Sequence, residues 1–190
     1  MKLQEFIANT IQEYLNEQNK LPLAPNGNPS NLSLPQYNIV RTTEFKNWFG
    51  DWENNPNNAS KMIDDNGEPL ICYHGTDTKF DVFDTKYQKD GWLGRGFYFT
   101  DDKKLTKDYG KINLSVFLNI KNPFIVKGNS PSDIIWEINT QYNPSNMQNS
   151  DVSQTLKMHN HDGIFFKHWD KGNMFSCFYS NQIKHIKDFK

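Results

Sequence analysis

Cysteine is scarce in this sequence, and so are long apolar runs and any excess of one charge. The 190 residues include two cysteines, Cys72 and Cys177, and both lie in apolar stretches. Two such thiols indicate buried, reduced cysteines and argue against a disulfide framework. The formal net charge of −1 at pH 7 gives no bulk sign of the basic surface that is typical of nucleic-acid-binding domains.

Membrane and metal signals are lacking as well. No apolar stretch is long enough to span a bilayer, and the N-terminus has no apolar core of a signal peptide. The sequence therefore predicts a cytoplasmic protein without a membrane partner. Short Cys and His clusters with zinc spacing are absent, and His159 and His161 flank Asn160 as in a solvated turn. We expect no metal cofactor.

The pattern along the chain divides it into three parts. Residues 1–19 carry apolar side chains at helical spacing, which predicts an amphipathic helix that packs on the domain or docks a partner. Residues 20–41 contain four prolines among Asn, Gly and Ser, which predicts an extended or disordered linker. Residues 42–190 then form the folded domain, which begins with a helix capped by Thr43.

Within the domain, short apolar segments alternate irregularly with helical ones, and an Asn66-Gly67 turn precedes the first strong strand. This mixture predicts the α+β class. The expected strands are 68–73, 96–100, 114–120, 162–166, 175–179 and 182–186, and the expected helices are 101–109, 133–140 and 152–159.

Two motifs stand out. The strand ending in Tyr73-His74-Gly75-Thr76 places an imidazole, a backbone without a side chain and a hydroxyl at the end of a sheet, where a flat ligand can approach closely. The segment Gly96-Phe97-Tyr98-Phe99-Thr100 adds aromatic side chains. Together they suggest a ligand pocket with a polar handle and aromatic walls. The plainer interpretation, two core strands with structural hydrogen bonds, stays open.

The sequence YHGT, then GFYFT, then a helical stretch ending at Tyr109 resembles the ADP-ribosyltransferases of the diphtheria-toxin and poly(ADP-ribose) polymerase type. It is most similar to the small bacterial and phage branch found in polyvalent proteins. The resemblance runs from about residue 43 to the C-terminus. It implies a split antiparallel sheet with short flanking helices. It also implies cleavage of the nicotinamide–ribose bond of NAD through a transition state that resembles an oxocarbenium ion.

The family pattern also implies roles for single residues. His74 would hydrogen-bond the 2′-hydroxyl of the nicotinamide ribose, and Gly75 would offer its backbone to the carboxamide. Tyr98 and Tyr109 would enclose the nicotinamide ring, and Thr106 matches a hydroxyl that also meets the carboxamide.

Thr76 and Gly96 complete the predicted set of NAD-binding residues, together with Arg95. A guanidinium suits phosphate geometry, so Arg95 in the glycine-rich loop 91–96 is a candidate for the pyrophosphate. An exposed loop arginine without a role is the alternative.

The third catalytic position departs from the pattern, because Met174 stands where related enzymes carry a glutamate. Asp170, just upstream, is the residue we favour for the missing carboxylate, although it could equally bond its own turn. Alternatively the site has no acid, and an acidic group of the target assists. Gln182 is the third candidate, but it lies about 26 Å further along an extended strand, which favours a structural role.

The resemblance thus implies a mono-ADP-ribosyltransferase, since chain elongation needs a base that Met174 cannot supply. NAD is the expected co-substrate, and its preference over NADP is inferred from the resemblance alone. The expected acceptor is a macromolecule, a host or defence protein in preference to nucleic acid, modified by a factor of a phage or mobile element. The alternatives are an NAD glycohydrolase, or a catalytically dead module that binds NAD or a protein.

Overall fold

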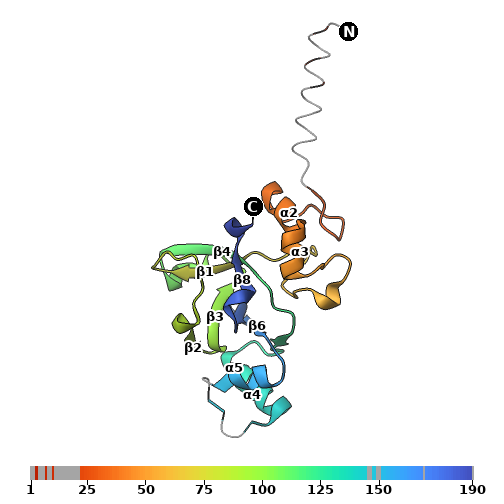
Figure 1. Cartoon of the computed structure of the whole chain (residues 1–190). Helices are drawn as coiled ribbons and strands as arrows, with labels where there is room; N and C mark the ends of the chain where they lie inside the picture. The colour runs from red at the N-terminus through yellow and green to blue at the C-terminus, as the bar shows by residue number, and fades with distance from the viewer. Residues whose placement is uncertain are drawn as a thin grey trace.

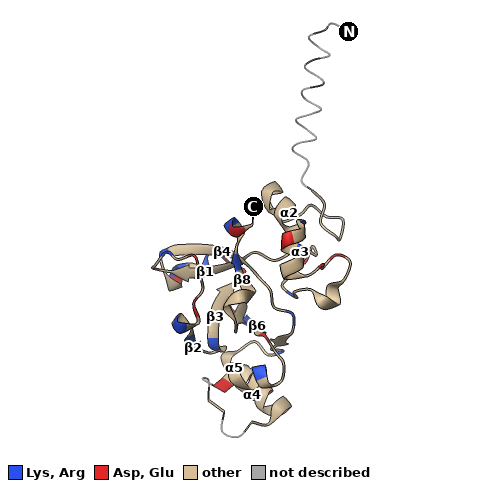
Figure 2. Cartoon of the chain, viewed as in Figure 1, with Lys and Arg blue, Asp and Glu red and all other residues tan. Residues whose placement is uncertain are grey.

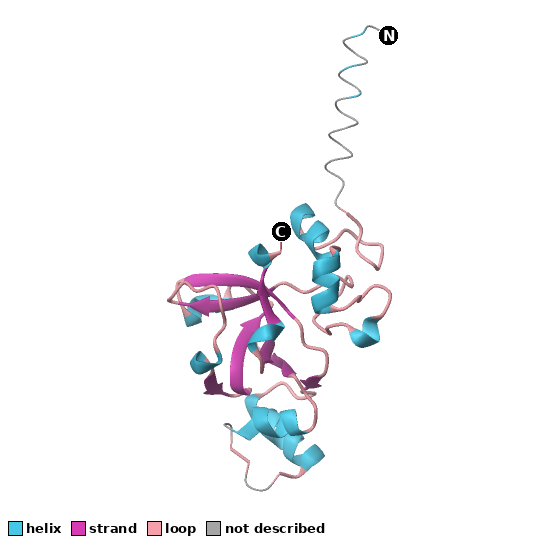
Figure 3. Ribbon diagram, viewed as in Figure 1, coloured by secondary structure: helices cyan, strands magenta, loops and turns pink. Residues whose placement is uncertain are grey.

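The computed structural model describes residues 3, 7, 10, 22–144, 147, 148, 151–168 and 170–189. Within these residues the fold is one large sheet with helices at both of its ends (Figure 1; Figure 3). The strand order is β5-β6-β7-β3-β1-β4-β8, and β2 pairs with β3. The strands are β1 (Cys72–Thr76), β2 (Lys89–Gly91), β3 (Gly94–Thr100), β4 (Ile112–Leu118), β5 (Pro123–Ile125), β6 (Gly163–His168), β7 (Gly172–Cys177) and β8 (Ile183–His185).

All neighbouring strands of this sheet run antiparallel except β5 and β6, which are parallel. The expected α+β class with a mostly antiparallel sheet is therefore confirmed. The sheet is split at its centre. Strand β1 pairs with β4 at every residue from Cys72 to Thr76, whereas its pairing with β3 is limited to Tyr73 opposite Thr100.

Two hydrophobic cores occupy the two faces of the sheet, because side chains alternate along each strand. Phe97 and Phe99 of β3 enter the first core, which α2 (Leu34–Val40) and α3 (Thr43–Phe49) cover. Tyr98, between them, packs against the second core, which is covered by α4 (Pro131–Tyr142) and α5 (Val152–Met158). Figure 1 shows the two pairs of helices at opposite ends of the molecule.

Residues 22–41 differ from the expected linker. They form a turn and helix α2. The backbone N–H of its N-cap residue, Ser33, donates a hydrogen bond to the Gln36 side-chain oxygen at 2.9 Å. Proline is compatible with this element because Pro35 stands in the first helical turn, where a missing N–H costs nothing. The division of the chain into domains stays a prediction. The expected helix over 1–19 lies outside the described residues, except for Leu3, Ile7 and Thr10, which are helical.

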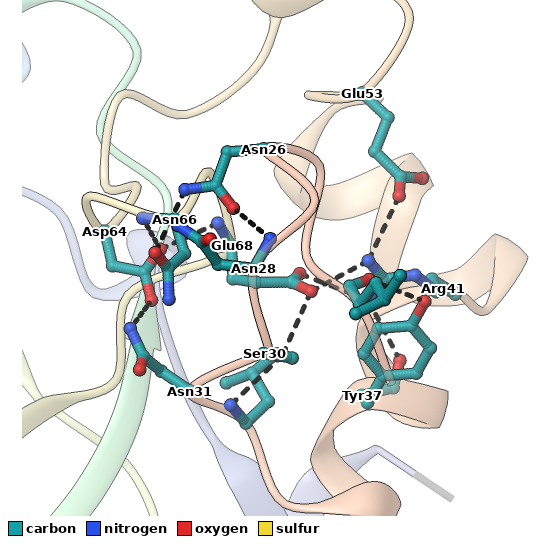
Figure 4. Close-up of polar contacts among 12 residues, drawn as sticks. Asn26, Asn28, Ser30, Asn31, Tyr37, Arg41, Glu53, Asp64, Asn66 and Glu68 are labelled. Carbon is teal, nitrogen blue, oxygen red and sulfur yellow. Dashed lines mark hydrogen bonds and ion pairs between the residues drawn. The ribbon is translucent and has the colours of Figure 1, made fainter. Parts of the chain in front are cut away.

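A buried carboxylate holds this N-terminal segment on the domain. Glu68 is 0% exposed. Its carboxylate accepts hydrogen bonds from two Arg41 guanidinium nitrogens, at 3.1 and 2.9 Å, and from the Ser30 hydroxyl at 3.0 Å. The Arg41 guanidinium also lies 3.4 Å from the centre of the Tyr37 ring. Figure 4 shows these contacts, with Asn and Asp side chains tying the turns on either side. Residues nearly forty positions apart thus share one polar centre.

Other boundaries move by local hydrogen bonding. The N-cap of α3 is Thr42, whose hydroxyl oxygen accepts from the Phe45 N–H at 3.2 Å, and not Thr43. The expected helix over 101–109 is reduced to a 3-10 helix, Leu105–Tyr109. Asp102 explains this difference, because its side chain accepts from the Lys104 N–H at 2.8 Å and so competes with the first helical turn. The glycine-rich loop 91–96 is largely the β2–β3 hairpin.

We expect Arg41→Ala to lower the free energy of unfolding by about 3 kcal/mol, because it leaves the buried Glu68 carboxylate without its charged partner. Denaturant unfolding at pH 7 measures the change. The matched control is Lys86→Ala, which removes an ion pair with Asp84 at 2.9 Å between side chains that are 63% and 42% exposed, and it should leave stability nearly unchanged. Equal effects of the two substitutions would contradict a structural role for the buried pair.

Candidate active site

His74 bridges the two central strands where they separate. Its Nδ1 lies 2.8 Å from the backbone oxygen of Tyr98 on β3. A carbonyl oxygen only accepts, so Nδ1 carries the proton and donates. The ring is enclosed by three phenylalanines, with centroid distances of 6.0 Å to Phe80, 5.3 Å to Phe83 and 5.5 Å to Phe99. In the neutral imidazole this leaves Nε2 as an acceptor, the form that can receive a hydrogen bond from a hydroxyl group.

Burial among these rings lowers the pKa of His74 from its ordinary value of 6.5. The hydrogen bond to the Tyr98 oxygen raises the pKa in part, and the charges of Lys89 and His185 lower it further. The net direction favours the neutral imidazole at pH 7. His74 is therefore held in one tautomer and one charge state.

Gly75 lies against the 3-10 helix that carries Thr106 and Tyr109. A Cβ atom built on Gly75 would stand 2.3 Å from the Thr106 backbone oxygen and 2.9 Å from the Tyr109 Cβ. No side chain fits there, so the motif requires glycine. The contact brings Gly75, Thr106 and Tyr109 together, although more than thirty residues separate Gly75 from the other two in the sequence. Tyr109 is 56% exposed, so its ring borders solvent.

The hydroxyls of Thr106 and Thr76 already have partners. The Thr106 hydroxyl donates to the Lys103 oxygen at 2.7 Å and accepts from the Asn113 side chain. The Thr76 hydroxyl donates to the Thr78 oxygen at 3.2 Å, in a turn that leaves β1. Thr106 is buried beside Gly75, whereas Thr76 belongs to the turn.

Tyr98 lies on the opposite side of the gap from Gly75. Because Tyr73 pairs with Thr100 and the strands are antiparallel, Gly75 and Tyr98 stand at the same level on either side of it. The Tyr98 hydroxyl donates to the Gly94 oxygen inside the β2–β3 hairpin. Burial, aided by the charge of Asp90, raises the pKa of Tyr98 well above its usual value, so the phenol stays neutral.

Arg95 and Gly96 lie on β3 and not in a free loop. Arg95 is exposed, pairs with Asp90 across the hairpin, and its guanidinium lies 3.9 Å from the Asp90 carboxylate. A Cβ on Gly96 would stand 2.3 Å from the Ser176 hydroxyl oxygen, so Gly96 allows close packing of β3 on β7. The structure therefore places Arg95 at the hairpin end of β3, and Gly96 in contact with the neighbouring strand.

The residues considered for the third position lie in three different places: the turn before β7, β7 itself, and the 3-10 helix that precedes β8. Met174 pairs with Thr100 and packs on the same core as Tyr98. The Asp170 carboxylate contacts His168 Nδ1 in the turn between β6 and β7. Gln182 is buried, and its side chain binds four backbone groups, of Phe178, Tyr179, Asn119 and Asp162, at 2.8 to 3.1 Å.

Sequence reasoning missed two features near this position. Asp101 follows β3 and accepts a hydrogen bond from Asn173, the residue before Met174. Its place directly after the GFYFT segment was the available signal. Trp92, at the tip of the β2–β3 hairpin, stacks on His168, with centroids 5.8 Å apart and 22° between the planes. Sequence alone carried no sign of that contact.

Lys, Arg, Asp and Glu side chains are spread over several elements, as Figure 2 shows. In the part of the chain that the structure describes, no group of three or more His, Cys, Asp or Glu side chains could hold a metal ion. None of the described helices is long and apolar enough to cross a membrane.

The structure thus brings a neutral imidazole and a bare glycine backbone to the gap between β1 and β3, with Tyr98 on the opposite strand and Tyr109 beside Gly75. One family model, ADP-ribosyltransferase in polyvalent proteins, matches residues 64–189 of this chain. The chain belongs to this family. The expected resemblance is therefore confirmed, and members of this family of ADP-ribosyltransferases use NAD as co-substrate.

Two other comparisons add less to the family assignment. A search of curated proteins gives no match. Among solved structures, the ADP-ribosyltransferase chain is similar to one described as the crystal structure of an anti-CRISPR protein, with a TM-score of 0.37 and 8% identity. The similarity covers 60% of this chain and 93% of the other.

We expect the titration midpoint of His74, followed by NMR of its ring, to lie below 6.5 in the folded ADP-ribosyltransferase. In urea the same residue should titrate near about 6.5. Because the unfolded chain takes up the proton first, the stability linked to His74 is present above pH 6.5 and is lost as the pH falls below it. A folded midpoint at or above the unfolded one would contradict the burial argument.

Proposed function

We propose that this chain is a mono-ADP-ribosyltransferase, which cleaves NAD at the nicotinamide–ribose bond and transfers one ADP-ribose to a macromolecular target. The observation that carries the proposal is the orientation of His74. Its Nδ1 donates to Tyr98 across the gap, so that Nε2 is left to accept a hydrogen bond from the ribose 2′-hydroxyl. Gly75 and Tyr98 stand at the same level on either side of that gap.

The proposed roles follow the family pattern, and the placement of Gly75, Thr106 and Tyr109 against one another supports them. The backbone of Gly75 binds the carboxamide, and the rings of Tyr98 and Tyr109 enclose nicotinamide. Thr106 meets the carboxamide through its hydroxyl, which exchanges its bond to the Lys103 oxygen. Thr76 and Gly96 border the co-substrate on either side. A flat ring held in this way is oriented for loss as neutral nicotinamide.

For the remaining charges of NAD we propose Arg95 and Asp170. Arg95 is exposed at the hairpin end of β3 and binds the pyrophosphate in exchange for its long contact with Asp90. Asp170 supplies the carboxylate that stabilises the ribosyl cation, held by His168. Met174 supplies no base for a ribose hydroxyl, which supports transfer of a single unit.

The proposed setting is the cytoplasm of a bacterial host, with a host or defence protein as the acceptor of a phage or mobile-element factor. This setting is supported by the family of polyvalent proteins and by no contact in the structure. Two other outcomes of the same site are NAD glycohydrolysis, in which water replaces the target, and binding of NAD without cleavage.

We expect a host-like lysate supplied with labelled NAD and the intact chain to yield a discrete labelled macromolecule together with free nicotinamide. His74→Ala should lower the rate about a hundredfold, because the ribose loses its hydrogen-bond partner. The matched control is His159→Ala, which changes a histidine that stacks on Tyr142 away from the gap. Parallel reactions with NADP test the choice of co-substrate.

The result can fail in two distinguishable ways. Nicotinamide release without a labelled macromolecule would replace transfer with glycohydrolysis. Absence of both label and nicotinamide, with NAD still bound, would leave only the binding module. Label that persists in His74→Ala would remove His74 from the mechanism.

We propose further that residues 1–19 dock a partner and take no part in cleavage of NAD. Deleting residues 1–19 should leave the rate of nicotinamide release within about twofold, because every residue assigned to the gap lies beyond residue 73, and should weaken modification of the target. The deletion must end before Pro22, since the Pro22 oxygen already accepts from Ser30 in the folded segment. A large loss of nicotinamide release would contradict this division of roles.

A further inference from the structure

The β2–β3 hairpin presents one indole ring to solvent. Gly91 pairs with Gly94, so that Trp92 and Leu93 form a two-residue turn, and Gly94 directly after it has a positive φ of 73°, which favours glycine. Leu93 is fully buried and anchors the turn, whereas Trp92 is 41% exposed. The turn therefore fixes the backbone of Trp92 and leaves its ring available.

The same turn is built on Tyr98. The Tyr98 hydroxyl donates to the Gly94 oxygen, and a Cβ on Gly91 would stand 2.7 Å from that hydroxyl. Trp92 is thus one tight turn from the ring that we assign to the nicotinamide pocket.

Trp92 is part of a mixed cluster, here named the Trp92 platform, which comprises Trp92, His168, Asp170 and Lys171. The indole stacks on His168. The Lys171 ammonium lies 5.8 Å from the centre of the indole, so this ring already attracts a cation. The Asp170 carboxylate contacts His168, and its side chain is 40% exposed.

An aromatic face that attracts a cation, with an exposed carboxylate joined to it through His168, suits a guanidinium, which would take the place of the Lys171 ammonium. The planar cation stacks on an indole and donates two parallel hydrogen bonds to a carboxylate. We propose that the Trp92 platform binds the guanidinium of an arginine side chain on the acceptor protein. The inference rests on the proposed transferase function and names its acceptor.

The reaction then balances without a further reagent. The bond between ribose C1′ and the nicotinamide nitrogen breaks, and nicotinamide leaves with the bonding pair. A guanidinium nitrogen forms the new bond to C1′ and loses one proton to solvent. NAD⁺ and an arginine side chain thus give neutral nicotinamide, ADP-ribosylated arginine and one proton.

The test uses the full chain, NAD and agmatine, a small guanidinium compound, with nicotinamide and ADP-ribosylated agmatine quantified by mass spectrometry. Trp92→Ala should raise the KM for agmatine about tenfold and leave the KM for NAD within about twofold. Trp92→Phe, which keeps an aromatic face, should restore part of the difference. The matched control is Trp136→Ala, which removes a more exposed tryptophan, 65% against 41%, from α4.

A second measurement does not depend on catalysis. The indole N–H signal of Trp92, assigned by its absence in Trp92→Phe, should shift saturably with agmatine and much less with putrescine, an amine without a guanidinium. An unshifted signal, or nicotinamide release without modified agmatine, would overturn the arginine assignment. So would modification of an oligonucleotide in its place. No nicotinamide release with any acceptor would overturn the transferase itself, and this inference with it.

Discussion

The site depends on the separation of β1 from β3 after a single residue pair. A sheet normally satisfies backbone groups strand by strand, so a gap at its centre needs another partner. The imidazole of His74 is that partner, since it donates to the Tyr98 oxygen across the opening. One side chain therefore satisfies the Tyr98 oxygen at the opening and leaves its second ring nitrogen free of that bond, so the residue that stabilises the fold is also the one we propose for the site.

Alternation along the central strands divides the work between two faces. On one face His74 lies among phenylalanines that keep it neutral. On the other face, Tyr98 and Met174 pack on the second core. Leu93 of the hairpin turn is buried in the same core, together with residues of α4 and α5. Gly94 packs closely on α5, since a Cβ atom built on it would stand 2.7 Å from the Ser153 nitrogen. This contact holds the turn that carries Trp92 against the helix.

Local signals predicted the central strands and the family, because the YHGT and GFYFT segments combine apolar period, glycine and turn chemistry within a few residues. Long-range polar contacts were out of reach. The sequence around Arg41 gives no indication that its partner is Glu68. Four prolines suggested a linker, whereas the structure forms helix α2 beside that buried pair. The third catalytic position was equally undetermined among Asp170, Met174 and Gln182, because the pairing of β7 with β3 and the hydrogen bond from Asn173 to Asp101 join residues far apart in the sequence.

The contacts of Glu68 distinguish the segment that matches the family from the longer segment that the fold requires. The segment by which the family is recognised begins at residue 64, yet the only cation on the Glu68 carboxylate is supplied from residue 41, within the residues that the structure describes. The segment that must be present for Glu68 to be neutralised is therefore longer than the segment that matches the family. In a mosaic protein, recombination at the recognisable boundary would transfer the motifs without their counter-ion, and a joint that preserves the fold must lie upstream of the Ser30 turn.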